Sequence, residues 1–85
     1  MTNIDTNEKE YEILIYNVIW LREHHALSKR KMAGLLGIST GSLNKLENGK
    51  IPPRLGVRVF YSIHKNFGIS PSILISKRLE ASKIP

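Results

Sequence analysis

The sequence has 85 residues, enough for one small domain whose single core is marginally stable and gains from a dimer interface. It contains no cysteine, which excludes a disulfide framework and a thiolate metal site. No apolar run approaches the roughly 18 residues of a membrane span. The N-terminus is polar and acidic rather than basic and then apolar, so we expect no signal peptide and a cytoplasmic protein.

The net charge of +6 is spread unevenly along the chain. Residues 1–23 hold five acids and two bases, a charge of −3, whereas residues 24–85 hold eleven bases and two acids, a charge of +9. Many basic proteins bind no nucleic acid specifically, so a basic surface alone is weak evidence. An acidic N-terminal part followed by a basic remainder nevertheless fits a protein that presents one face to a polyanion.

The N-terminal part of the chain predicts one long helix. Residues 1–6 show no periodicity and are expected to fray. Asn7 and Glu10 resemble a capping box, so we predict a helix over about residues 8–25; its length and caps outweigh a strand-like interpretation. The apolar residues at helical spacing are expected to face the core: Tyr11, Leu14, Val18 and Leu21.

A second apolar stripe lies on the same predicted helix and exceeds what one core face needs. It consists of Ile13, Tyr16 and Trp20. The stripe either packs against the C-terminal helix of the same chain or forms a dimer or partner interface. Both interpretations stay open.

Residues 29–48, KRKMAGLLGISTGSLNKLEN, predict two short helices that meet across a tight turn. Ser28 is placed to cap the first helix, and Gly37 is placed to end it because glycine adopts positive φ without steric cost. Ser39 is placed to cap the second helix, and Ile38 fills the corner. The contact between the helices is expected to come from their apolar positions: Met32, Ala33, Leu36, Leu43 and Leu46.

This stretch resembles the helix-turn-helix of Cro-like phage repressors and of the broad XRE family. Its apolar positions, the alanine at 33 and the glycine at 37 match that family, and so do the flanking Leu21-Arg22 and the run from Leu46 to Lys50. The resemblance, which covers roughly residues 18–75, implies an all-α fold, a compact bundle of about five helices of the lambda-repressor-like type, and a pairing of Glu47 with Arg22. The predicted N-terminal helix is extended beyond the family norm. From the length of the chain we expect one domain, over residues 7–82, followed by a short end at 83–85.

The chain after the motif predicts a turn and a fourth helix. Gly49 suits the end of the second motif helix, and the prolines at positions 52 and 53 forbid its continuation. A helix is expected to resume near Leu55. Its apolar residues alternate like a strand but also keep helical spacing, and the family resemblance favours the helix, which Gly68 closes.

A last helix is predicted over about residues 71–81, because Ser70 and Pro71 match an N-cap followed by proline at the first helical position. Its aliphatic surface, which includes Ile75 and Leu79, is a second candidate for the dimer interface. The family resemblance supports this alternative, since related repressors often pair through this end of the domain.

The resemblance places the second motif helix in the major groove of DNA. Residue by residue, it assigns base contacts to Thr40, Gly41, Asn44 and Lys45. Asn44 is suited to adenine, Lys45 to guanine acceptors, and Thr40 to a thymine methyl group or an acceptor. Gly41 weakens the helix by roughly 0.5–1 kcal/mol relative to alanine, which indicates close backbone approach or relaxed sequence demands. Phosphate contacts are expected from the flanks of the motif: Lys29, Arg30, Ser42, Asn48, Lys50 and Arg54.

The predicted function is sequence-specific regulation of transcription by a repressor that binds a palindromic operator in double-stranded DNA as a homodimer. No enzyme, cofactor or metal is expected, since there is no cysteine and the adjacent His24 and His25 do not share a helix face. The alternative is an antitoxin-like or antirepressor-like module that binds a protein partner and DNA only weakly or non-specifically. In that case the stripe on the first helix carries the function.

Overall fold

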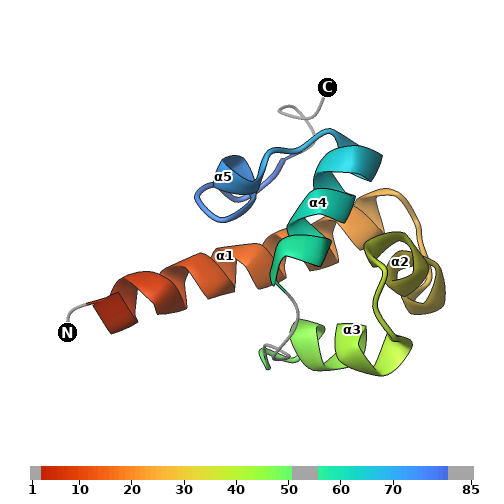
Figure 1. Ribbon diagram of the computed structural model, residues 1–85, viewed down its shortest axis with the longest axis horizontal. Helices are drawn as coiled ribbons and strands as arrows, with labels where there is room; N and C mark the ends of the chain where they lie inside the picture. The colour runs from red at the N-terminus through yellow and green to blue at the C-terminus, as the bar shows by residue number, and fades with distance from the viewer. Residues whose placement is uncertain (1–2, 51–55, 81–85) are drawn as a thin grey trace.

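The computed structural model describes residues 3–50 and 56–80. Within these ranges the chain forms helices and no strand, which confirms the predicted all-α bundle of about five helices. Figure 1 shows a long first helix with the other helices gathered around its C-terminal part, while its N-terminal end projects away from them. The helices are α1 (Asn3–His24), α2 (Lys29–Leu36), α3 (Thr40–Glu47), α4 (Gly56–Phe67) and α5 (Pro71–Leu74).

The first helix is longer at its N-terminus than the sequence predicts. α1 begins at Asn3 rather than near residue 8, so Asn7 lies inside the helix and the predicted cap at Asn7 is wrong. The physical reason is that residues 3–7 contain no glycine or proline to interrupt the helical hydrogen bonds. Tyr11 is also corrected: it is 48% exposed, because the buried stripe of α1 begins at Leu14.

One hydrophobic core joins all the helices. Among the described residues it contains apolar side chains from each helix, from the connection between α4 and α5, and from the segment after α5: Leu14, Val18, Leu21, Met32, Ala33, Leu36, Leu43, Leu46, Val59, Ile63, Ile69, Leu74 and Leu79. Full burial stabilises each of the larger side chains by roughly 1.5–3 kcal/mol. The predicted faces of both motif helices therefore meet in the core, as their spacing indicated.

The ambiguous segment after the motif is a helix. In α4, Val59 and Ile63 are buried four residues apart, whereas Val57 is 84% exposed and Tyr61 is 63% exposed. Burial thus follows the helical period rather than the strand-like alternation. Leu55, where the helix was expected to resume, lies outside the described residues.

The C-terminal helix is much shorter than predicted. α5 has four residues and ends at Leu74, so the expected helix over residues 71–81 is wrong beyond that point. The cause is Asn17 of α1, which is fully buried. Its Nδ2 donates to the carbonyls of Leu74 at 2.7 Å and Lys77 at 2.8 Å, and its Oδ1 accepts from the backbone N–H of Leu79 at 2.9 Å. The Asn17 amide therefore satisfies backbone groups that, in a continued helix, would each have bonded to another backbone group of that helix.

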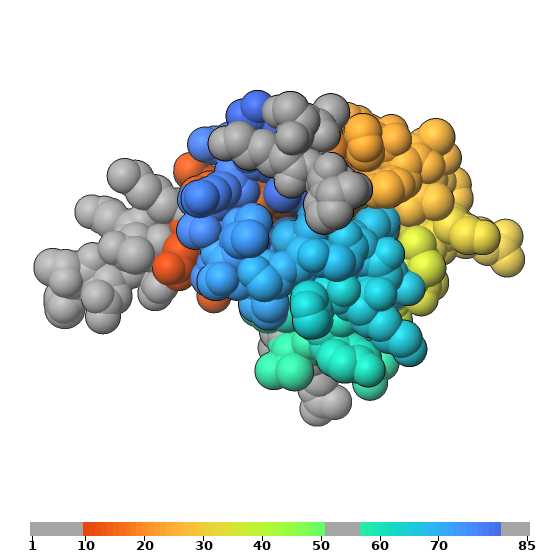
Figure 2. Space-filling model, turned by 90° about the horizontal axis from the view of Figure 1, so that it is seen from above, coloured from red at the N-terminus to blue at the C-terminus, as the bar shows by residue number. Residues whose placement is uncertain are grey.

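The Asn17 bonds hold the segment after α5 against α1. Figure 2 shows this segment, in blue, lying over α1, in red and orange. Leu79, predicted to lie on an exposed dimer surface, is instead buried in the core, and Ile75 is half-buried against it. Part of the apolar surface of α1 is thus covered by the same chain. Among the described residues, no helix combines the length and hydropathy needed to cross a membrane.

Candidate nucleic-acid interface

The two motif helices are capped as the sequence predicts. Ser28 accepts a hydrogen bond from the N–H of Lys31 at 3.0 Å, and Ser39 accepts one from the N–H of Ser42 at 3.0 Å. Gly37 ends α2 with φ +72°, and Gly49, with φ +90°, directly follows the C-cap of α3. These local signals set where each motif helix begins and ends.

Two observations favour glycine at position 37. Its positive φ strains any residue with a side chain, and a Cβ there would lie 3.2 Å from Cδ of Arg58. Arg58 packs so closely because its Nη1 donates to the Gly37 carbonyl at 3.2 Å. The contact from Arg58 of α4 therefore holds the turn between α2 and α3.

Three polar side chains of α4 satisfy the carbonyls of the last two residues of α2 and of its C-cap, Gly37. Besides Arg58, Ser62 donates to Leu36 at 3.4 Å, and Asn66 donates to Leu35 at 3.2 Å. The three donors are spaced four residues apart and so lie on one face of α4. They supply partners for carbonyls that a helix end leaves unpaired. Sequence analysis missed them, although their i, i+4, i+8 spacing was a visible signal.

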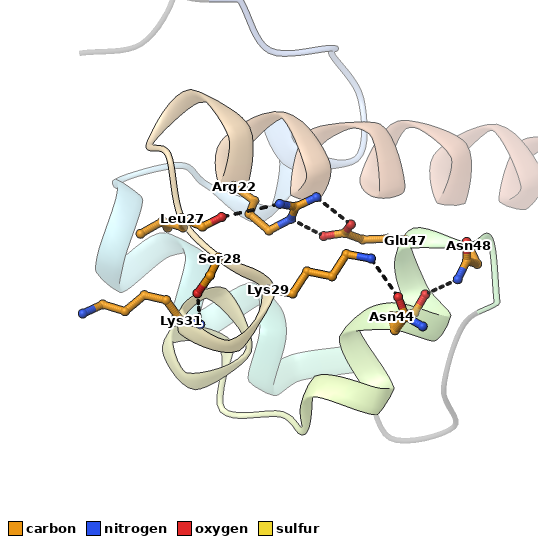
Figure 3. Close-up of polar contacts among 8 residues, drawn as sticks. All are labelled: Arg22, Leu27, Ser28, Lys29, Lys31, Asn44, Glu47 and Asn48. Atoms are coloured by element: carbon orange, nitrogen blue, oxygen red, sulfur yellow. Dashed lines mark hydrogen bonds and ion pairs between the residues drawn. The ribbon is translucent and has the colours of Figure 1, made fainter.

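The predicted ion pair between Arg22 and Glu47 is present and connects the end of α1 to the end of α3 (Figure 3). Arg22 donates from Nε at 2.7 Å and from Nη2 at 3.0 Å, so the contact is bidentate. The two side chains are only 17% and 7% exposed. The hydrogen bond to Glu47 raises the pKa of Arg22. The pair holds α3 in a defined orientation relative to α1.

The outer face of α3 carries every residue predicted to meet bases. Thr40, Gly41, Asn44 and Lys45 are all exposed, whereas Leu43 and Leu46 on the opposite face are buried. A Cβ at Gly41 would meet only Oγ of Ser39, at 3.9 Å. The fold itself therefore does not require glycine at this position.

The predicted phosphate contacts surround this face unevenly. Lys29 and Arg30 are exposed at the start of α2, and no acid lies in the first turn of either motif helix. Lys50 is exposed after α3, but Ser42 is half-buried and accepts a hydrogen bond from the Ser39 hydroxyl at 3.0 Å. Asn48 is exposed, and its Nδ2 donates to the Asn44 carbonyl at 2.8 Å. Arg54 lies outside the described residues.

One contact joins the two groups of predicted residues. Nζ of Lys29 donates to Oδ1 of Asn44 at 2.8 Å, so a predicted phosphate contact holds a predicted base contact (Figure 3). Lys29 and Asn44 both remain exposed to solvent while they form this bond. Sequence analysis missed this pair because the two residues are fifteen positions apart on different helices.

The sequence model of a family described as a helix-turn-helix domain matches residues 17–80. This chain belongs to that helix-turn-helix family. The match covers more than half of the chain and includes α2, α3 and α4, as well as the segment that Asn17 holds. No curated protein and no solved structure matches the chain.

Residues 3–16, the first two thirds of α1, lie outside the family match. Of the predicted interface stripe, Ile13 is half-buried and Tyr16 is 40% exposed, with the guanidinium of Arg78 5.3 Å from its ring centroid. Trp20 lies inside the match, packs against the core and stacks on His24 at 4.3 Å. The stripe is thus partly occupied within the chain and partly accessible.

Proposed function

We propose that this helix-turn-helix protein is a sequence-specific transcriptional regulator of the Cro-like, XRE type. The observation that carries the proposal is the arrangement of α3. One face of α3 exposes Thr40, Asn44 and Lys45, which take no part in the core, while its other face is buried. Arg22 of α1 holds its C-terminal end through Glu47. A rigidly held helix with a free polar face is what reading a major groove requires.

The charge around α3 supports the same proposal. Lys29, Arg30 and Lys31 open α2, where the helix dipole also favours an anion. Lys50 lies just beyond the other end of α3. We therefore assign phosphate binding to both flanks of the motif, with base contacts between them.

Gly41 fits a close approach to DNA. Its surroundings leave room for a side chain, so the fold does not require glycine there. We therefore attribute the glycine to a close contact with DNA. In this proposal the first turn of α3 comes near the DNA at Gly41, while Thr40 contacts a thymine methyl group or a base acceptor.

The regulator is proposed to act as a homodimeric repressor. One motif reads few base pairs, and two motifs on a palindrome read half-sites about 34 Å apart. The accessible part of α1, with Ile13 and Tyr16, is the proposed interface, because Leu79 at the other candidate surface is buried. Occupying a promoter in this way would block transcription without chemistry by the protein.

The experiment is selection of bound duplexes from a random DNA library at two salt concentrations. The parent is compared with Asn44→Ala and Lys45→Ala, and Lys65→Ala is the matched control because Lys65 is exposed on α4, outside the motif. We expect a palindromic sequence that the first two substitutions relax at defined positions, while the control recovers the parent's sequence. The affinity should also fall steeply with salt.

Salt-sensitive binding without any enriched sequence would contradict this function. It would favour the second candidate, an antitoxin-like or antirepressor-like module that acts through a protein partner. The observation behind that candidate is the N-terminal part of α1, which lies outside the family match and exposes Tyr11 and Tyr16.

A further inference from the structure

The bond between Lys29 and Asn44 places a cation against the middle of α3. Lys29 is the first residue of α2, where the positive end of the helix dipole disfavours a lysine. Its Nζ lies 2.8 Å from Oδ1 of Asn44 rather than near a carboxylate. The ammonium group therefore reaches across the motif to a neutral acceptor on the helix that is proposed to read bases.

This bond changes what Asn44 offers to a base. An asparagine that reads adenine uses both ends of its amide: the oxygen accepts from the adenine amino group, and the nitrogen donates to N7. Here the oxygen is directed toward Lys29, and the planar amide turns its NH₂ group away from that ammonium. The free end of Asn44 is thus a donor, and the neighbouring Lys45 side chain is also only a donor.

We propose that Lys29 is a specificity-determining positioning residue that sets Asn44 to read guanine. Guanine presents two acceptors, N7 and O6, in the major groove, whereas adenine presents one acceptor and one amino donor. A face that offers the Asn44 NH₂ group and the Lys45 ammonium as donors matches the guanine pattern and does not match the amino donor of adenine. The inference rests on the proposed function, and it replaces the adenine contact expected from the residue type of Asn44 alone.

The test is duplex selection with the full chain, comparing the parent with Lys29→Met and Lys29→Arg. Methionine keeps much of the side-chain length but removes the donor, whereas arginine keeps both charge and donors. Arg30→Met is the matched control, because Arg30 is the next exposed cation of α2 and has no described hydrogen bond to α3. Thermal melts of all variants show that the domain is folded.

We expect the parent to select guanine at the base pair that Asn44→Ala relaxes. Lys29→Met should lower the ratio of guanine to adenine at that base pair by at least about fivefold, and Lys29→Arg should restore it. Arg30→Met should weaken binding to all sequences alike and leave the ratio unchanged. In an Asn44→Ala background, Lys29→Met should no longer change the ratio.

Two results would overturn the inference. One leaves the proposed function intact, and the other overturns the proposed function as well. If the parent selects a motif and Lys29→Met weakens binding without changing the guanine-to-adenine ratio, Lys29 is a phosphate contact only and the proposed function stands. If the parent selects no sequence at all, both the inference and the proposed sequence-specific function fail.

Discussion

The two motif helices have eight residues each, whereas α1 has 22 residues and extends beyond the rest of the fold. Isolated helices as short as α2 and α3 are marginal in water, so they depend on contacts from other elements. Those contacts come from Arg22 of α1 and from Arg58, Ser62 and Asn66 of α4. The N-terminal part of α1 has no comparable support among the described contacts and relies on its length. The comparison shows that polar bonds from α1 and α4 support the two short motif helices, whereas the N-terminal part of α1 has no such bonds among the described contacts.

The largest loss should follow from Asn17→Leu, which keeps a similar side-chain volume but removes three hydrogen bonds to buried or half-buried backbone groups. Each unpaired group costs about 1–3 kcal/mol, so we expect the free energy of unfolding to fall by roughly 3 kcal/mol or more. Urea denaturation followed by circular dichroism measures this change.

Asn66→Ala is the control for Asn17, because Asn66 bonds backbone carbonyls from an exposed position. Its loss should be about 1 kcal/mol or less. Equal losses for the two variants would show that Asn17 does not hold the C-terminal segment as described.

Arg22→Met tests the brace between α1 and α3. It leaves the Glu47 carboxylate, 7% exposed, without its bidentate partner, and we expect a loss of about 2–3 kcal/mol in urea denaturation. The raised pKa of Arg22 means that its stabilisation is present below the unfolded-state pKa and lost only as the pH rises through the folded-state pKa. Both pKa values are far above neutrality, so the guanidinium contributes equally from about pH 5 to 9.

The control for this brace is Glu23→Gln, which changes an exposed acid next to Arg22. It should alter the free energy of unfolding by less than about 0.5 kcal/mol. A pH-dependent difference between Arg22→Met and the parent within that range would contradict a role for the permanently charged guanidinium alone.

Gly37→Ala and Gly34→Ala form a matched pair within α2 and its C-cap. At Gly37 the positive φ and the close Arg58 side chain predict a loss of about 1–2 kcal/mol. Gly34 is inside the helix with nothing within 4 Å of an added Cβ, so alanine there should stabilise by about 0.5–1 kcal/mol. Thermal denaturation of both variants should therefore give shifts of opposite sign; shifts of the same sign would refute this account of the turn.

The features that sequence analysis predicted correctly depend on neighbours along the chain or on the family resemblance. Ser28, Ser39 and Ser70 cap helices because a cap involves residues only two or three positions away. The pair of Arg22 and Glu47 is distant in sequence, but the family resemblance indicated it. The exposed face of α3 followed from the same helical period that identified its buried face.

The features that were missed depend on contacts between distant residues. The end of α5 at Leu74 is set by Asn17, which is 57 positions away, and nothing local in the sequence of residues 71–81 forbids a longer helix. The bond from Lys29 to Asn44 likewise arises only when the motif helices are packed. A single sequence shows which residues can donate and accept, but the fold decides which of them meet.

Gly41→Ala has the smallest predicted effect on stability and separates the fold from the interface. The added methyl group has room, so the free energy of unfolding should rise by about 0.5 kcal/mol, as for alanine at Gly34. If the backbone of α3 approaches DNA at Gly41, the same substitution should weaken binding to the selected operator, measured by fluorescence anisotropy at fixed salt. A variant that is both more stable and unchanged in affinity would show that Gly41 lies away from the DNA, and would restrict the reading face to Thr40, Asn44 and Lys45.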